Sequence, residues 1–193
     1  MGNLKQRLIV AVVGILIMFV CVQFYNWRKY FSGVRTEQHP NGKVWSKKTY
    51  HQGKLNGSAW EYYESGELWM EYSHKDGKLE GPKKTYYQNG TIMSIEPYAE
   101  GFLAGDVQLF FQDGSIKEKA QYFGGQRSGL TEVYFPSGSI MHRDLYMNGV
   151  KNGRCVEYFE SGPVKVAEVY QYGNIVSRTI YDETGEMIHE DVY

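Results

Sequence analysis

The sequence predicts an all-β repeat array: an elongated antiparallel meander of β-hairpins, preceded by one transmembrane helix. Three observations support this fold class, namely an apolar segment near the N-terminus and two residue types, glycine and tyrosine, that recur with a 24-residue period. The segments between the glycines suit strands and are short for helices. With 22 glycines, 17 tyrosines and 16% aromatic residues, the chain has the composition of a folded protein with many turns.

The N-terminal apolar segment runs without interruption from Leu8 to Val22. Counted on to Trp27, it reaches about the 20 residues that a bilayer core requires. A signal sequence is the alternative, but no cleavage site with small residues follows the segment. We therefore expect an uncleaved membrane anchor over residues 8–27.

The chain then divides into four parts along its length. These are a short polar tail (1–7), the transmembrane anchor (8–27), a linker (28–37) and a β-hairpin repeat domain (38–193).

The orientation of the anchor follows from its flanking charges. Lys5 and Arg7 precede it, whereas Arg28, Lys29 and Arg35 follow it, so the positive-inside count nearly ties or leans toward a cytoplasmic repeat domain. A short charged tail before an early apolar segment resembles a signal anchor, which exports the residues that follow it. We expect the repeat domain on the extracytoplasmic side.

The repeat is defined by three series of glycines. The first glycine of each unit is Gly42, Gly66, Gly90, Gly114, Gly138 or Gly162, in steps of 24, and Gly185 follows after a step of 23. A second glycine comes 11 residues after the first and a third 4 residues later, and Ser177 breaks the third series. Eight residues after the first glycine stand Tyr50, Tyr98, Tyr122, Tyr146, Tyr170 and Tyr193, with His74 as the one substitute. Such a fixed period indicates tandem structural repeats.

Turn chemistry predicts the register of the hairpins. Asn-Gly and Asp-Gly turns supply the positive φ angles of tight hairpins, so each repeat should be two antiparallel strands. A two-residue loop ending on the first glycine pairs Tyr63/Leu68, Tyr87/Ile92, Phe111/Ile116, Phe135/Ile140 and Phe159/Val164. The same reasoning at the second glycine pairs Tyr50/Leu55, Tyr98/Leu103 and Tyr170/Ile175. Each pair joins an aromatic to an aliphatic residue, and together the pairs should form the packed face.

The order of residues resembles a known family. Segments such as YYESGELWMEYSHKDGKLEG and FFQDGSIKEKAQYFGGQRSG are similar to the variant MORN repeat, and the similarity extends over residues 38–193 as six full units and a partial one. The resemblance implies tandem β-hairpins that contact protein or membrane, in a family with many antitoxin-like members, and carries over no catalytic residue. The departures are Gln38-His39, His74 and Asp182, in or near the end units, where capping repeats differ from the rest.

Other functional classes find little support in the sequence. The net charge of −1 excludes the basic field that nucleic-acid binding requires. Cys21 and Cys155 are too far apart in sequence to suggest a disulfide framework. No histidine pair has metal-ligand spacing and no catalytic motif is present, so we expect no enzyme, no metal and no cofactor.

The candidate binding site is an aromatic stripe. Residues four before and three after the first glycine should point away from the packed face, and they are most aromatic in the first units: Trp45, Tyr62, Trp69, Tyr86 and Met93. An exposed aromatic stripe is typical of a contact surface for protein or sugar. The alternative is that this face also packs, on itself or on a second copy.

These observations favour a membrane-anchored, non-enzymatic repeat protein that acts as a protein–protein interaction or scaffold module. An antitoxin or immunity role is the version that the resemblance implies. One alternative is an extracytoplasmic repeat protein that binds glycans or the cell wall, although Trp45, Trp60 and Trp69 cluster in the first units and do not recur. Another is a structural spacer, whose function would depend on the number of units.

Overall fold

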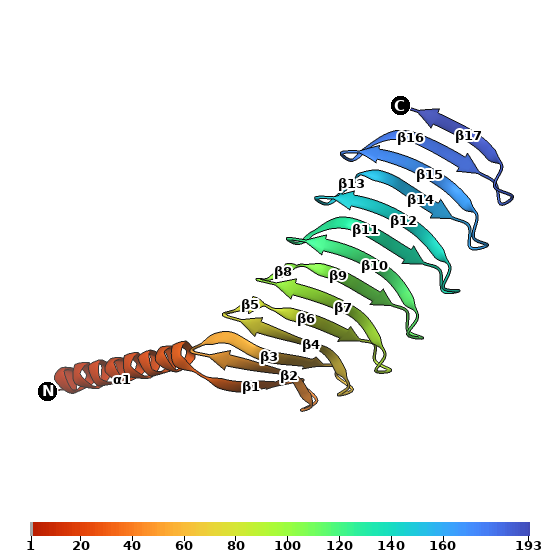
Figure 1. Cartoon of the computed structure of the whole chain (residues 1–193). Helices are drawn as coiled ribbons and strands as arrows, with labels where there is room; N and C mark the ends of the chain where they lie inside the picture. The colour runs from red at the N-terminus through yellow and green to blue at the C-terminus, as the bar shows by residue number, and fades with distance from the viewer. Residues whose placement is uncertain (1) are drawn as a thin grey trace.

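The computed structural model describes residues 2–193, although the side chains of residues 2–8 and of residue 28 lie outside the description. Within these residues the chain forms one helix, α1 (Gly2–Tyr30), and one sheet of 17 strands. Figure 1 shows the strands side by side in chain order, with α1 leaving the sheet at its N-terminal end. The predicted fold class, an open antiparallel meander of hairpins, is confirmed.

The strands alternate with short turns along the whole array. Their bounds are β1 Gly33–Gln38, β2 Val44–His51, β3 Lys54–Tyr62, β4 Leu68–Lys75, β5 Lys78–Leu79, β6 Gly81–Tyr86, β7 Ile92–Ala99, β8 Phe102–Leu103, β9 Gly105–Phe110, β10 Ile116–Phe123, β11 Gln126–Tyr134, β12 Ile140–Met147, β13 Val150–Lys151, β14 Gly153–Tyr158, β15 Val164–Gln171, β16 Asn174–Tyr181 and β17 Met187–Val192.

The sheet begins earlier than the sequence analysis expects. All of β1 except Gln38 lies in the segment 28–37 that the sequence predicts as a linker, and Gly33 pairs with Tyr50 of β2. The same relation recurs where Gly81 pairs with Tyr98. Gly33 is thus a member of the third glycine series, which the sequence analysis began one unit later. Residues 31 and 32 separate α1 from β1.

The second turn of each repeat has the predicted geometry. Tyr50 faces Leu55, and the pairs Tyr98/Leu103 and Tyr170/Ile175 are also present, so this part of the register is confirmed. Both residues of each two-residue loop have positive φ, which is the signature of a type I′ turn. Non-glycine residues therefore occupy the left-handed region at Gln52, Asp76, Glu100, Asn148 and Tyr172.

The first turn of each repeat is one residue longer than predicted. The Tyr63 N–H donates to the Glu67 carbonyl and the Gly66 N–H donates to the Tyr63 carbonyl, which encloses a three-residue loop. Tyr62, and not Tyr63, therefore faces Leu68. The expected pairs Tyr63/Leu68, Tyr87/Ile92, Phe111/Ile116, Phe135/Ile140 and Phe159/Val164 are wrong by one residue; the observed pairs are Tyr62/Leu68, Tyr86/Ile92, Phe110/Ile116, Tyr134/Ile140 and Tyr158/Val164.

A β-bulge follows each three-residue loop. Glu61 pairs with Met70 while Tyr62 pairs with Leu68, so Trp69 is an extra residue on its strand. The equivalent extra residues in the other units are Trp45, Met93, Lys117, Met141, Lys165 and Ile188. Such a bulge interrupts, at the extra residue, the alternation of side chains between the two faces of the sheet.

The two faces of the sheet differ in burial. The buried residues belong to one face, with the exception of Val156: Ser46, Ala59, Glu61, Thr85, Ser94, Val107, Ala120, Thr131, Cys155 and Val166. We call this the packed face. On it, tyrosines lie opposite the third-series glycines, as Tyr146 does opposite Gly129. Neither a helix nor a second sheet covers either face within residues 33–193.

The single step of 23 residues and the missing glycine have one structural cause. In most units the third glycine lies in a bulge of two extra residues, such as that between the pairs Lys48/Ala59 and Tyr50/Leu55. In the last unit Val169 pairs with Ser177 and Tyr170 with Ile175, which leaves a bulge of one extra residue. Compared with the other units, the last unit lacks the bulge residue that adopts positive φ. It therefore needs no third glycine.

Helix α1 is joined tightly to the sheet. Its segment Ile9–Trp27 has a mean hydropathy of 2.3, is not buried by the rest of the molecule, and is long enough to cross a membrane. Beyond it, the Gly53 N–H donates to the Phe31 carbonyl at 2.8 Å. The ring of Phe31 lies 5.2 Å from that of Trp27 and 5.9 Å from that of Tyr50. The junction between the helix and the array is therefore held by packed aromatic rings and a backbone hydrogen bond.

Candidate interaction surfaces

The structure divides the predicted aromatic stripe between the two faces. Trp69 lies against Tyr63, with ring centroids 6.1 Å apart, and Lys48 lies over the ring of Trp45 at 5.4 Å. Lys48 is on the packed face, opposite Ala59. The bulge therefore turns Trp45 and Trp69 toward the packed face, and it places Met93 at the equivalent position.

Tyr62 and Tyr86 lie on the opposite face, as the sequence analysis expects. Tyr86 is half-buried, and its hydroxyl donates to Glu71 at 2.8 Å. The Lys84 ammonium also contacts that carboxylate at 3.2 Å. Burial and the neighbouring Glu71 charge raise the pKa of Tyr86 to about 12. Tyr86 is thus held in a polar network, and the expected stripe is not one continuous surface.

A polar cluster occupies the packed face of the first units. Glu61 is buried, accepts a 2.7 Å hydrogen bond from the Tyr72 hydroxyl, and lies 2.8 Å from the Lys48 ammonium. Burial alone would raise the pKa of Glu61, but these donors and the Lys48 charge outweigh burial, so the pKa is lowered. Both contacts are made by Oε1, and together they hold the carboxylate as a charged structural group.

His74 belongs to the same cluster. It lies opposite Gly57, its ring meets that of Tyr72 edge-on at 5.3 Å, and its Nδ1 is buried without a hydrogen-bond partner. Burial and the positive charge of Lys48 lower the pKa of His74. His74 therefore occupies the position of the repeat's tyrosine, and its neutral ring covers Gly57.

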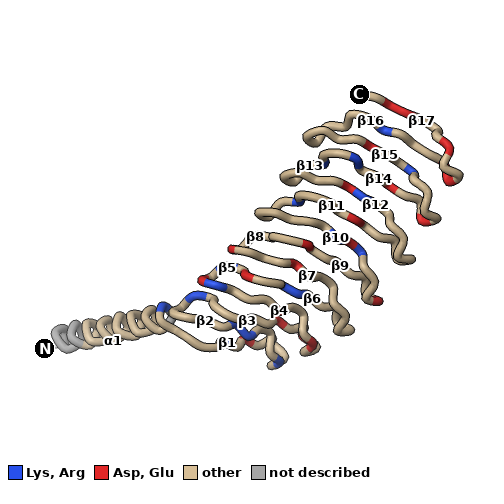
Figure 2. Tube along the Cα trace, viewed as in Figure 1, with Lys and Arg blue, Asp and Glu red and all other residues tan. Residues whose placement is uncertain are grey.

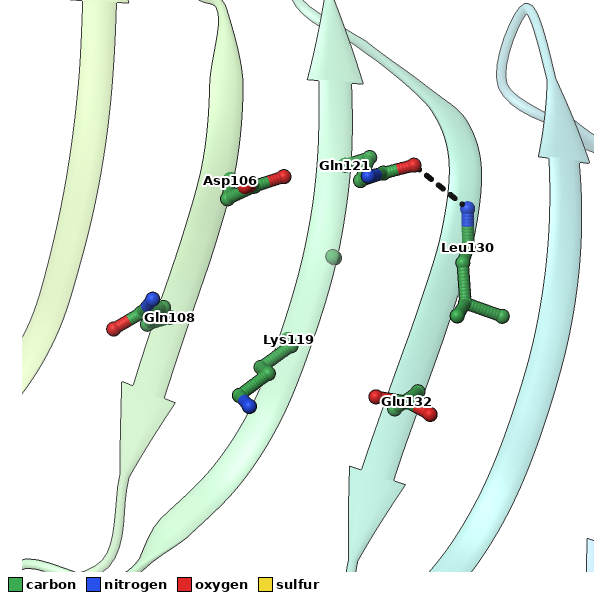
Figure 3. A pocket seen from close by; sticks show the side chains of 7 residues that line it. Asp106, Gln108, Lys119, Gln121, Leu130 and Glu132 are labelled. Carbon is green, nitrogen blue, oxygen red and sulfur yellow. Dashed lines mark hydrogen bonds between the residues drawn. The ribbon is translucent and has the colours of Figure 1, made fainter.

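The depressions on the sheet surface are shallow. One lies on the opposite face across β9, β10 and β11, and Figure 3 shows the side chains that line it. The lining residues are Asp106, Gln108, Lys119, Ala120, Gln121, Leu130 and Glu132. The Gln121 side-chain oxygen accepts a 3.1 Å hydrogen bond from the Leu130 N–H, so part of the polar surface is already satisfied. Among the residues searched within the described chain, no group of three or more acidic, histidine or cysteine side chains could hold a metal ion.

Between β3 and β16, the exposed large apolar side chains gather along one edge of the array. Among them, the most exposed are Phe123, Tyr172 and Phe102, at 79%, 70% and 60% exposure. They lie at or beside the type I′ turns, together with Met147 and Val150. We call these five residues the turn row. Leu145 and Val169, on the strands that enter two of these turns, are also exposed and extend the apolar surface.

Neighbouring turns of this edge are linked to one another. The Gly125 N–H donates to the Leu103 carbonyl, and the Gly173 N–H donates to the Lys151 carbonyl. Phe102 lies beside Gly125, since a Cβ built on that glycine would be 3.5 Å from the Phe102 ring. The turn row is therefore an ordered surface that spans several repeats.

The other edge of the array is different. Its three-residue loops consist of proline, glycine and polar or acidic residues, and none of their described side chains is a large exposed hydrophobe. The sequence analysis missed the turn row because it examined the residues flanking the first glycine. The available signal was that the residues around the second glycine become apolar in the C-terminal half.

Charge does not single out another surface. Figure 2 shows lysine and arginine interspersed with aspartate and glutamate along the described part of the array. Many are paired across strands, as in Arg143–Glu132 at 2.9 Å and Lys83–Glu96 at 3.4 Å. The pattern is that of a solvated repeat surface.

The comparison with protein families agrees with the repeat geometry. The family model described as MORN repeat variant matches residues 31–52 and 79–100. These two segments carry the variant MORN repeat. The starting residues of the two matches are separated by two repeat periods, and the first match begins at Phe31, which supports the early start of the MORN array. A search of curated proteins finds no match.

Proposed function

We propose that the chain is a membrane-anchored, non-enzymatic scaffold whose partner protein docks on the turn row. The observation that carries this proposal is the difference between the two edges of the MORN array. One edge presents Phe102, Phe123 and Tyr172 to solvent, whereas the loops of the other edge are polar. Apolar patches of this kind on soluble surfaces mark interaction sites.

Helix α1 supports the membrane anchor. Its segment Ile9–Trp27 exposes apolar side chains on all sides, which is the pattern of a helix in lipid. A signal sequence passes the same test, and the flanking charges leave the orientation open between the two sides. We propose an uncleaved anchor that holds the array on the extracytoplasmic side.

A protein partner fits the turn row better than a glycan does. Sugar-binding surfaces expose aromatic rings beside polar groups that read hydroxyls. Here Trp69 packs on Tyr63 and Trp45 packs under Lys48, so these indoles are engaged within the chain. The turn row instead combines aromatic and aliphatic side chains in contiguous turns. An antitoxin or immunity role is one form of the same binding function, and it rests on the family resemblance.

The experiment compares two triple variants of the full-length tagged chain in its own membrane. The test variant carries Phe102→Ser, Phe123→Ser and Tyr172→Asn. The control carries Gln112→Ser, Pro136→Ser and Glu160→Ser, which change loops of the other edge. After cross-linking in cells, we expect a protein that co-purifies with wild type and control to be lost from the test variant. Identical recovery from all three would contradict the proposal.

A bilayer contact is the second candidate for the turn row, because α1 leaves the sheet from the same edge. Photoactivatable lipids distinguish the two. If the lipid labels the array in the control variant but not in the turn-row triple variant, the turn row contacts lipid. Labelling restricted to α1 would favour the protein partner.

A further inference from the structure

The two ends of the array are complementary to each other. The chain begins its sheet with the strand that normally follows a type I′ turn, and it ends with the strand that normally precedes one. β1 has the position in its unit that β3 and β6 have in theirs, and β17 has the position of β2 and β4. A second copy could therefore continue the sheet where the first one stops.

The register of such a continuation is fixed by the pairs inside the array. Glu168 lies six residues after Gly162, the first glycine of its unit. It pairs with Arg178, which lies seven residues before Gly185, the first glycine of the next unit. Asp191 and Arg35 hold these same two positions in the last and first units. The internal pair is an ion pair with 3.5 Å between Arg178 Nε and Glu168 Oε1.

We propose that the chain self-associates end to end, with β17 of one copy pairing with β1 of the next. In the repeat register Asp191 lies opposite Arg35 of the second copy, and His189 lies opposite Glu37. Tyr193 lies opposite Phe31, in the position of the internal pair Tyr50/Leu55. This inference is independent of the partner on the turn row.

Both edges carry charges that select this pairing. Within one copy, Arg35 and Glu37 form an ion pair at 3.2 Å, and His189 Nε2 lies within hydrogen-bond distance of Asp191 Oδ1, at 3.0 Å. These pairs join residues two apart on one strand face, so each residue can exchange its partner for the one across the interface. Charged edge strands normally prevent sheet-to-sheet association. A β17–β17 pair would bring acidic residues together, whereas β17–β1 brings opposite charges together.

The outer edges of both strands are open. β1 pairs only with β2 and β17 only with β16 among the described strands, which leaves a row of backbone donors and acceptors on each. Val34 and Val192 are also strongly exposed at the two edges. Because the contact joins unlike surfaces, copies add head to tail, and each added copy leaves a free edge for the next.

The test traps the interface with cysteines in the full-length chain, purified in detergent. In a Cys21→Ser background, one tagged population carries Arg35→Cys and a differently tagged one carries Asp191→Cys. Cys155 is buried and remains in both. The control population carries Gln112→Cys, on an exposed loop of the polar edge. We expect mixed disulfides between the first two populations at about tenfold the level found with the control.

Charge exchange provides the second readout. Arg35→Asp alone should dissociate the end-to-end chains in size-exclusion chromatography, and adding Asp191→Arg should restore them. Both positions are exposed edge residues, and circular dichroism with a melting curve verifies that each variant folds. Equal disulfide yields with the control, dominant Arg35→Cys homodimers, or failure of the double variant to restore association would each overturn the proposal.

Discussion

The hydroxyl of Tyr63 donates a 2.7 Å hydrogen bond to the backbone carbonyl of Tyr86, in the next repeat. Tyr87 makes the equivalent bond to the Phe110 carbonyl at 2.8 Å. In the first unit, where the sequence departs from the repeat pattern, His39 Nε2 takes this role with the Tyr62 carbonyl at 3.0 Å. Later units have phenylalanine at this position, so this side-chain bond between repeats belongs to the N-terminal half.

The inter-repeat bond should be measurable by removing and adding one hydroxyl. Tyr63→Phe keeps the ring against Trp69 and leaves the Tyr86 carbonyl without this donor. We expect a loss of about 1 kcal/mol in the free energy of unfolding. Phe111→Tyr places a hydroxyl at the equivalent position and should increase stability by up to about 1 kcal/mol. Chemical denaturation of the full-length chain in detergent measures both, and a loss in both variants would contradict this account.

His74 should make the array sensitive to mild acid. Its folded-state pKa is lowered, so the folded chain disfavours the protonated ring. The stability associated with this group is complete above the unfolded value near 6.5 and decreases as pH falls below it. His74→Tyr restores the repeat's own residue and should reduce the drop in melting temperature between pH 7.5 and about pH 5. His51→Gln, at an exposed position, is the matched control and should leave the drop unchanged.

The type I′ turns contain residues poorly suited to positive φ. Glu100 has φ of +53° and Asn148 has +51° at equivalent positions. Asparagine tolerates this conformation better than glutamate does. Glu100→Asn should therefore raise the free energy of unfolding by about 0.5–1 kcal/mol, and Asn148→Glu should lower it by a similar amount. The ion pair of Glu100 with Lys78 is solvent-exposed and contributes little. Effects of the same sign in both variants would refute this explanation.

The repeat sequence predicts the period, the hairpins and the type I′ register, because glycine spacing and the aromatic–aliphatic pairs are local features. It does not separate a two-residue from a three-residue loop at the first glycine. Both alternatives place an aromatic opposite an aliphatic residue, as Tyr63/Leu68 in one and Tyr62/Leu68 in the other. The decision comes from the backbone bonds of Tyr63 and Gly66, which composition does not reveal.

The candidate site was harder to predict than the fold. A bulge of one residue turns Trp69 from the face of Tyr62 to that of Tyr63, and strict alternation cannot represent such a residue. The turn row lies beside the second glycine of each repeat, away from the positions flanking the first glycine that define the predicted stripe. Only the structure shows Phe123 and Tyr172 to be exposed beside one edge of the sheet.

The central claim, that the turn row is the docking surface, can be tested most directly by site-specific photo-crosslinking in intact cells. A photoreactive amino acid replaces Phe123 in one variant and Gln112, on the polar edge, in another. The account predicts a discrete protein adduct from position 123 that is absent from position 112. Adducts of equal yield at both positions, or an adduct at position 112 alone, would contradict it.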